Sequence, residues 1–222
     1  MNSYDFLKFL TVNLQAKKEI TNNLCTATGF YLILKGKPVI VTAKHFAKDA
    51  QELLTVPVHY KENDTIITLS VTTNVEWIYS DEYDIAYCSI KPIADRLKKI
   101  TGKDMFYTAI TEKDIIRNDE LDDIKILSEV LTMGYPYGES STHHQFPLFK
   151  KGYISSSPGD FEEDCVGYLE LTGEKGCSGS PVLLNNHQLK LVGILVKYIG
   201  SNTDSQKNTT IYITADKILD IK

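Results

Sequence analysis

The sequence predicts an all-β fold built from two packed halves. Short runs rich in β-branched and aromatic residues recur through most of the 222 residues, and polar or glycine-containing turns separate them. Strands at such spacing are typical of a β-barrel or a β-sandwich. A stretch of different composition, residues 92–123, divides the runs into two groups, 24–91 and 124–222, and we expect these groups to be two halves of one unit.

A helical arm is predicted ahead of the first strand, over residues 1–23. Within residues 4–18 the apolar side chains recur at the three- and four-residue spacing of one helix face, and Ser3 is placed to cap the helix. We expect this arm to cover a barrel edge. The residues that carry the spacing are Phe6, Leu7, Leu10 and Leu14.

A β-hairpin opens the first half. Apolar runs at residues 28–34 and 39–42 flank the turn Lys35-Gly36-Lys37-Pro38. Further strands of this half are predicted over residues 53–60, 66–73 and 85–90.

Residues 92–123 are predicted to connect the halves. Residues 93–100 have the pattern of a helix, whereas residues 112–123 hold six acidic and two basic side chains. We interpret this acid-rich end as a solvated connection, with an interaction surface as the alternative. Strands of the second half are predicted over residues 124–133, 152–156, 167–171, 181–184, 189–196 and 209–214, and a short closing helix over 215–221.

Composition narrows the classes of function. With 24 basic and 29 acidic side chains the net charge is −5, and no basic stripe suited to nucleic acid is present. No apolar run approaches the roughly 20 residues that span a bilayer, so no membrane is expected as a partner. Asp5 and Lys8 interrupt the stretch where a signal peptide would be apolar, which predicts a cytoplasmic protein.

The cysteines lead to the same expectation about location. Cys25, Cys88, Cys165 and Cys177 lie far apart without C-x-x-C spacing, which argues against a zinc site and against a disulfide framework. We therefore expect reduced thiols in a cytosol-like compartment.

The segment Gly176-Cys177-Ser178-Gly179-Ser180-Pro181 is the sharpest chemical signal. Small residues around one serine permit a tight turn that exposes the hydroxyl and directs successive N–H groups into one concavity. A serine hydroxyl is a weak nucleophile until a base takes its proton, so this interpretation requires a histidine and a carboxylate that orients it.

His45 is the best-placed base, because it follows the apolar run 39–42 where a barrel can present it to a cleft. Asp84, just before an alternating apolar run, is the first choice for a buried carboxylate, and Asp81 is the second. The remaining histidines are predicted to be surface residues: His59, His143, His144 and His187.

Three blocks together resemble the catalytic blocks of the chymotrypsin-like (trypsin-fold) serine peptidases: Thr42-Ala43-Lys44-His45, Asp84-Ile85-Ala86 and Gly176 to Pro181. Their order, His, Asp, Ser, is that of this family. Residues 134–138 and 151–155 are similar to its bacterial and HtrA-like members, and Val192-Gly193-Ile194 to the glutamyl endopeptidases. The resemblance implies two antiparallel Greek-key β-barrels.

The family also implies a role for each matched residue. Ser178 would attack the acyl carbon, His45 would act as general base and then general acid, and Asp84 would orient the imidazole. The N–H groups of Gly176 and Ser178 would bind the oxyanion. A protein or peptide substrate is implied, and no metal or organic cofactor.

The pocket positions depart from well-known members. Thr172, six residues before Ser178, replaces the aspartate of trypsin-type enzymes, and Leu195 replaces the histidine that follows Gly-Ile in the glutamyl group. We expect a shallow pocket for a small or uncharged apolar side chain, with Lys175, Val196, Lys197 and Tyr198 along its wall.

Two alternatives stay open. Cys177 invites comparison with viral cysteine peptidases of the same fold, although it occupies the position before the nucleophile. A catalytically silent or partner-activated protein that binds a peptide or protein would have the same sequence features. An intracellular peptidase of this type would be regulated, and the N-terminal arm and the 92–123 connection are where an activating protein would dock.

Overall fold

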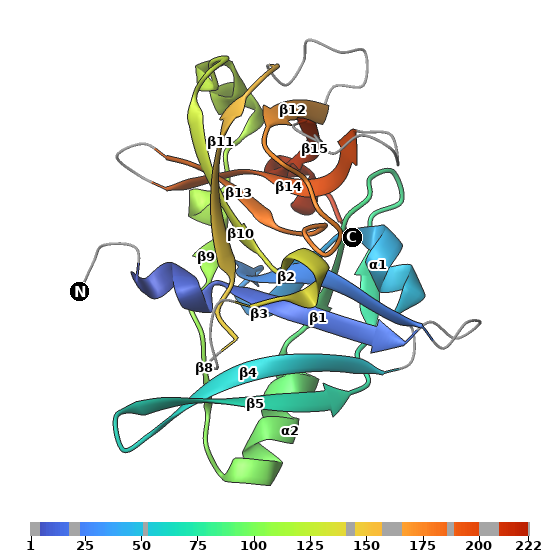
Figure 1. Cartoon of the computed structure of the whole chain (residues 1–222), viewed down its shortest axis with the longest axis vertical. Coiled ribbons are helices and arrows are strands. Elements are labelled where there is room, and N and C mark those ends of the chain that lie inside the picture. The colour runs from blue at the N-terminus through green and yellow to red at the C-terminus, as the bar shows by residue number, and fades with distance from the viewer. Residues whose placement is uncertain are drawn as a thin grey trace.

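The computed structural model consists of two β-rich halves packed side by side (Figure 1). It describes residues 5–17, 23–50, 53–140, 145–156, 166–185, 189–199 and 209–221.

An open sheet forms the first half, in the strand order β5-β4-β1-β2-β3-β7-β6, with β8 paired to β4 and β9 to β2. The expectation of a closed first barrel is therefore wrong. The short strand β6 pairs with β7, and β5 pairs with β4, so the two ends of the sheet do not join. The strands are β1 (Thr11–Lys17), β2 (Leu24–Leu34), β3 (Lys37–Thr42), β4 (Leu54–Glu62), β5 (Thr65–Thr73), β6 (Trp77–Tyr79), β7 (Ala86–Ser89), β8 (Met105–Phe106) and β9 (Ile110–Thr111).

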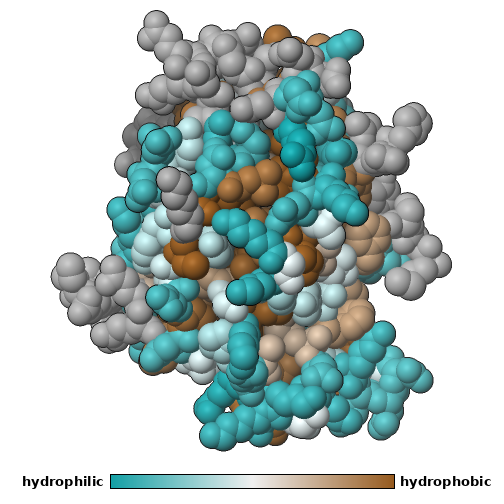
Figure 2. All heavy atoms as spheres, turned by 180° about the vertical axis from the view of Figure 1, so that it is seen from behind, coloured by the Kyte–Doolittle hydropathy of each residue, from teal (hydrophilic) through white to brown (hydrophobic). Residues whose placement is uncertain are grey.

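Helix α2 (Lys91–Thr101) packs against β5, the strand at one end of this sheet. Its Ile93 and Leu97 are fully buried and belong to the same apolar cluster as the interior of the sheet. The exposed side of α2 is charged, and Figure 2 shows hydrophilic side chains covering the lower end of the molecule, where α2 and the β4–β5 hairpin lie.

The N-terminal segment is not a helical arm. The 3-10 turn η1 (Asp5–Phe9) leads directly into β1, which pairs along its whole length with β2 and at Gln15 and Ala16 with β4. As a strand with neighbours on both sides, β1 is buried on both faces, so its apolar residues need no alternation. Sheet pairing thus outweighs a helix-like spacing of leucines. The proposed cap Ser3 lies outside the described residues.

The second half is a closed six-stranded barrel in the order β10-β11-β12-β15-β14-β13. The predicted strands of this half are present, with shifted ends: β10 begins five residues later than expected and β14 extends to Ile199. The closing helix is a shorter 3-10 turn, η5 (Ala215–Ile218). The strands are β10 (Glu129–Gly134), β11 (Leu148–Ile154), β12 (Val166–Glu170), β13 (Pro181–Leu184), β14 (Lys190–Ile199) and β15 (Thr209–Thr214).

The connection is more than a solvated link. After α2, strands β8 and β9 join the first sheet, and two 3-10 turns follow, η2 (Glu112–Asp114) and η3 (Asn118–Asp123). Between these turns Ile115 and Ile116 are buried, and the Ile116 N–H donates to Leu191 O of the second barrel at 2.9 Å. The acid-rich end is therefore anchored to the second half by its two isoleucines.

The two halves share an apolar core. One cluster of buried residues includes Leu32 and Val41 from the first sheet, and Met133, Leu183 and Ile194 from the barrel. Because no layer of polar residues separates these side chains within the cluster, the sheet and the barrel are packed as one body.

Candidate active site

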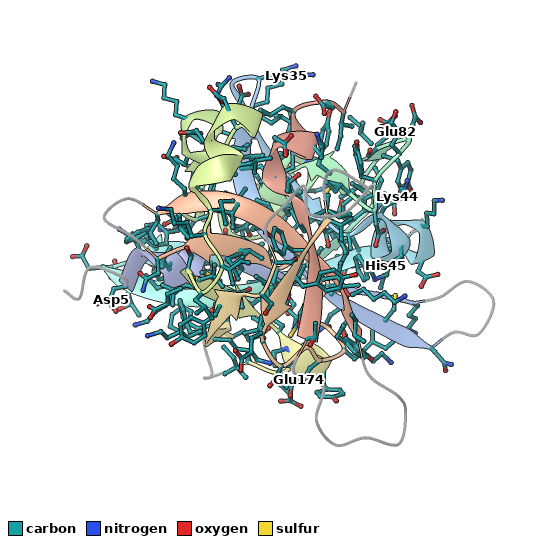
Figure 3. The ribbon with its side chains drawn as sticks, turned by 90° about the horizontal axis from the view of Figure 1, so that it is seen from above. Asp5, Lys35, Lys44, His45, Glu82 and Glu174 are labelled. Atoms are coloured by element: carbon teal, nitrogen blue, oxygen red, sulfur yellow. The ribbon has the colours of Figure 1, made fainter. Side chains whose placement is uncertain are left out.

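His45 and Asp84 are brought together by the pairing of β3 with β7. Thr42 lies opposite Ala86, so the chain just after β3 faces the bend just before β7. Helix α1 (Lys44–Asp49) begins there and carries His45 in its first turn. In Figure 3, His45 and Lys44 lie next to each other, on the opposite side of the molecule from Asp5.

Both carboxylate oxygens of Asp84 bind His45. The His45 backbone N–H donates to Oδ1 at 2.8 Å, and His45 Nδ1 lies 2.7 Å from Oδ2. Because a carboxylate only accepts, Nδ1 carries the proton of this bond and Nε2 is left as the basic nitrogen. Asp84 therefore fixes both the position and the tautomer of the ring. It lies in a bend and is one-third exposed, not buried on a strand as expected.

Ser178 lies in the loop between β12 and β13, and two glycines set the course of this loop. Gly176 and Gly179 have φ values of +94° and +87°, in the left-handed region. A Cβ on Gly179 would lie 2.0 Å from Thr28 O, and one on Gly176 would lie 2.3 Å from Tyr135 O. No side chain fits at either position, so the loop passes close enough to both halves to present Ser178 at their junction.

Two backbone N–H groups of this loop have no acceptor among the described residues. Those of Gly176 and Ser178 donate to no other group within the part of the chain that the structure describes. Three other N–H groups of the loop are used: Cys177 donates to Glu174 O, Gly179 to Leu195 O and Ser180 to Cys177 O. The loop thus keeps two donors for a ligand at the positions that the sequence predicted.

A cavity of about 980 Å³ joins the predicted residues. His45, Asp84, Ser178 and Gly176 all line it, so residues from both halves contribute to one site. Its remaining lining residues are Asn23, Leu24, Cys25, Thr26, Phe46, Asp49, Lys175, Val196, Lys197, Tyr198 and Ile211.

Comparison with known proteins bears on this geometry. The family model described as trypsin-like peptidase domain matches residues 27–194, three quarters of the chain, a range that includes His45, Asp84 and Ser178. The chain belongs to the trypsin-like peptidase family. Its fold is similar to the crystal structure of the Rv3671c protease from M. tuberculosis in its active form, with a TM-score of 0.59 and 14% identity. That match covers 96% of this chain and 79% of the other.

Thr28 is a site residue of this trypsin-like peptidase that the sequence interpretation missed. From β2, its N–H donates to Ser178 O at 2.9 Å and its hydroxyl to Gly176 O at 2.9 Å. Its own carbonyl accepts from the Thr42 hydroxyl at 2.8 Å, and its hydroxyl accepts from the Tyr135 N–H at 3.0 Å. Within a β-branched run, Thr28 carries no signal of this role, because its partners come from distant segments.

Thr172 does not line the cavity, which corrects the pocket prediction. It lies at a separate hollow of about 590 Å³, and its carbonyl accepts from Lys150 Nζ at 3.1 Å. The predicted wall residues Lys175, Val196 and Tyr198 do line the cavity. Tyr198 also packs on Gly173, where a Cβ would lie 2.4 Å from the Tyr198 Cβ. The Tyr198 side chain therefore occupies the space between this part of the cavity wall and Gly173.

The position of Cys177 argues against the alternative in which this cysteine is the nucleophile. Its side chain is 7% exposed and faces a small hollow inside the barrel, not the large cavity. Burial raises the pKa of the Cys177 thiol above its ordinary value, although Lys150 opposes this. A thiol rather than a thiolate is therefore present at neutral pH.

The other candidates are located elsewhere. Asp81 is in contact with Lys44 Nζ through its backbone carbonyl, at 3.5 Å, whereas Asp84 binds the His45 ring. His59 is buried on β4 and not on the surface, because its ring lies beside Thr68 and packs against the edge of Phe9. His143, His144 and His187 lie outside the described residues.

The described ranges hold no group of three or more His, Cys, Asp or Glu side chains suited to a metal ion. Among these same residues, no helix combines the length and the apolar character needed to cross a membrane.

Proposed function

We propose that the protein is a serine endopeptidase that uses Ser178, His45 and Asp84 as its catalytic triad. The observation that carries the proposal is the two-point contact of Asp84 with His45 beside Ser178 in one cavity. Membership of the trypsin-like peptidase family supports protein or peptide substrates.

The chemistry follows from this arrangement. Ser178 Oγ attacks the carbonyl carbon of the peptide bond while His45 Nε2 takes its proton, and Asp84 stabilises the imidazolium. The negative oxygen of the tetrahedral intermediate accepts from the N–H groups of Gly176 and Ser178, each of which contributes about 3 kcal/mol. His45 then protonates the leaving amine as the C–N bond breaks. Water, deprotonated by His45, hydrolyses the resulting acyl-enzyme.

Location and control are part of the proposal. Among the described residues, Cys88 and Cys177 are buried thiols that form no disulfide, which supports a reducing compartment, the cytosol. A peptidase in that compartment has to be held in check, so we propose that a protein partner regulates it.

A fluorophosphonate probe, which reacts with an activated serine, tests the function. Purified wild-type protein is expected to be labelled, and Ser178→Ala is expected not to be. The measurement is repeated with cell lysate added, so that a partner-activated enzyme is also detected.

Equal labelling of both proteins, or labelling of neither with lysate present, would contradict the assignment. The second of these results would favour the alternative, a silent member of the family that binds a peptide or protein partner. Tyr198 on the cavity wall is the observation that favours this alternative, because its side chain occupies space next to the site.

A further inference from the structure

Two lysines line the cavity on the side of the nucleophile. Lys175 directly precedes Gly176, and Lys197 lies on β14. Both side chains are exposed, and within the described part of the chain neither ammonium group forms a hydrogen bond or an ion pair. Neighbouring lysines are used differently: Lys150 pairs with Glu174, and Lys190 with Glu120. The cavity therefore holds two ammonium groups that have no counter-ion among the described residues.

The acidic residues of the same wall do not neutralise these lysines. Asp84 is bound to His45, and Asp49 has an interaction of its own. With a net charge of −5 for the whole chain, unpaired positive charge at this location runs against the overall balance. Such a local reversal of sign attracts anionic ligands to the cavity.

A β-bulge explains how Lys197 comes to line the cavity. In a regular strand successive side chains point to opposite faces. On β14, however, Val196, Lys197 and Tyr198 all line the same cavity. The register with β15 shifts between Leu195 and Lys197, which is the type of irregularity that redirects side chains.

The bulge also lies where a substrate would run. Strand β13 pairs with β14 from Lys190 to Ile194, and Leu195 is bonded to Gly179 and Ser180. Beyond Leu195, β13 no longer covers that edge of β14, so an extended peptide can add there as a further strand. Since a strand rises about 3.3 Å per residue, Lys197 lies beside a substrate residue about two or three positions from the attacked carbonyl.

We propose that Lys175 and Lys197 select substrates with acidic side chains two or three residues before the cleaved bond. This inference rests on the proposed function, because it assumes that the cavity takes a peptide. At the cleaved bond itself a small or uncharged side chain is expected, since Tyr198 and Thr210 Oγ1 fill the space at Gly173. Lys175 and Lys197 are thus the specificity residues and Ser178 the reacting one.

Matched peptides test the proposal. Quenched fluorogenic peptides of one sequence carry Glu, Gln or Lys at the second and third positions before the cleaved bond. Wild type is expected to cleave the Glu peptide with a kcat/KM roughly two- to fivefold higher per lysine than the Gln peptide. Because exposed charges are screened, 0.5 M NaCl is expected to reduce this ratio towards one.

Charge reversal assigns the effect to the two residues. The double variant Lys175→Glu, Lys197→Glu is expected to prefer the Lys peptide over the Glu peptide. Lys99→Glu is the matched control, because Lys99 lies on the exposed side of α2 and outside the cavity lining. This control is expected to keep the wild-type ratio.

Binding to Ser178→Ala, measured by fluorescence anisotropy with the same peptides, separates the two proposals. Binding that favours Glu and reverses in the double variant, without cleavage by wild type, would support the charge selection and contradict the proposed function. Cleavage at equal rates for Glu and Gln peptides would overturn the charge selection alone. So would a preference for Glu that survives the double reversal.

Discussion

A single threonine, Thr28, is hydrogen-bonded to both halves at the candidate active site. Thr28 donates to Ser178 O and Gly176 O, on either side of Cys177, and accepts from Thr42, three residues before His45. These bonds fix the distance between the strand that leads to His45 and the loop that carries Ser178. Thr28 is therefore a positioning residue that acts through the backbone of the loop.

Removing the Thr28 hydroxyl is expected to slow catalysis. Thr28→Val keeps the shape of the side chain but leaves the buried Gly176 carbonyl and Tyr135 N–H without their partner, at a cost of about 1–3 kcal/mol each. Because the N–H groups of Gly176 and Ser178, the proposed oxyanion donors, are then less firmly oriented, kcat is expected to fall about tenfold or more. KM is expected to change less than twofold. Steady-state kinetics with one peptide measures both.

The serine variant and a distant threonine serve as controls. Thr28→Ser retains the hydroxyl and is expected to restore most of the rate. Thr55→Val removes an exposed hydroxyl pair with Thr72 and is expected to leave kcat unchanged. A rise in KM without a fall in kcat would argue against a positioning role for Thr28. So would a fall in kcat in Thr28→Ser as large as that in Thr28→Val.

Among single residues, the sequence predicted those candidate site residues that lie in short local motifs. His45 and Ser178 each lie in a local block, and Asp84 follows from the turn that precedes an apolar run. Thr28 was missed because its hydroxyl bond to Gly176 spans 148 residues and depends on how the halves pack. The misplacement of Thr172 has the same cause, since a position in a loop does not reveal which side of the loop faces the cavity.

Elements were predicted well where pattern and pairing agree. The hairpin β2–β3 and helix α2 are confirmed, because the apolar runs around the turn and the helical spacing of α2 coincide with the residues that the fold buries. The predicted helix over the N-terminal segment was wrong, because β1 is a central strand that is buried on both faces. The apolar residues of this segment match a helical spacing by chance. Closure of the first sheet cannot be inferred from strand positions alone.

Helix α2 is expected to be a principal support of the open first sheet. Leu97 is fully buried in the interior cluster of that sheet, so Leu97→Ala leaves a cavity and is expected to lower the free energy of unfolding by about 2–5 kcal/mol. Urea unfolding measures the change. Lys99→Ala on the exposed side of the same helix is the control, with an expected change within about 0.5 kcal/mol. Similar midpoints for the two variants would mean that α2 contributes little to the core.

On the scale of the whole molecule, the shared core makes the halves dependent on each other. Leu183 of the barrel packs in the same cluster as Leu32 and Val41 of the sheet. The chain holds one tryptophan, Trp77, which lies in the sheet and bonds to Ala50 O. Its fluorescence therefore reports on the first half, whereas far-UV circular dichroism reports on both.

We expect unfolding in one transition. Trp77 fluorescence and circular dichroism are expected to give the same midpoint, and Leu183→Ala is expected to lower both by an equal amount although it lies in the other half. Phe149→Ala, at a half-exposed position on β11, serves as the control and is expected to change little. Two separate midpoints, or a shift in circular dichroism alone, would show that the halves unfold independently.

The position of Thr28 on β2 also has a consequence for the order in which the enzyme is made. A chain is synthesised from its N-terminus, and domains tend to fold as they emerge. Strand β2 is thus complete long before Ser178 is added, and the bonds of Thr28 to Ser178 O and Gly176 O form only once that loop has been made. If Ser178 is the nucleophile, as proposed, a partly made chain that holds only β2, His45 and Asp84 is expected to have no peptidase activity.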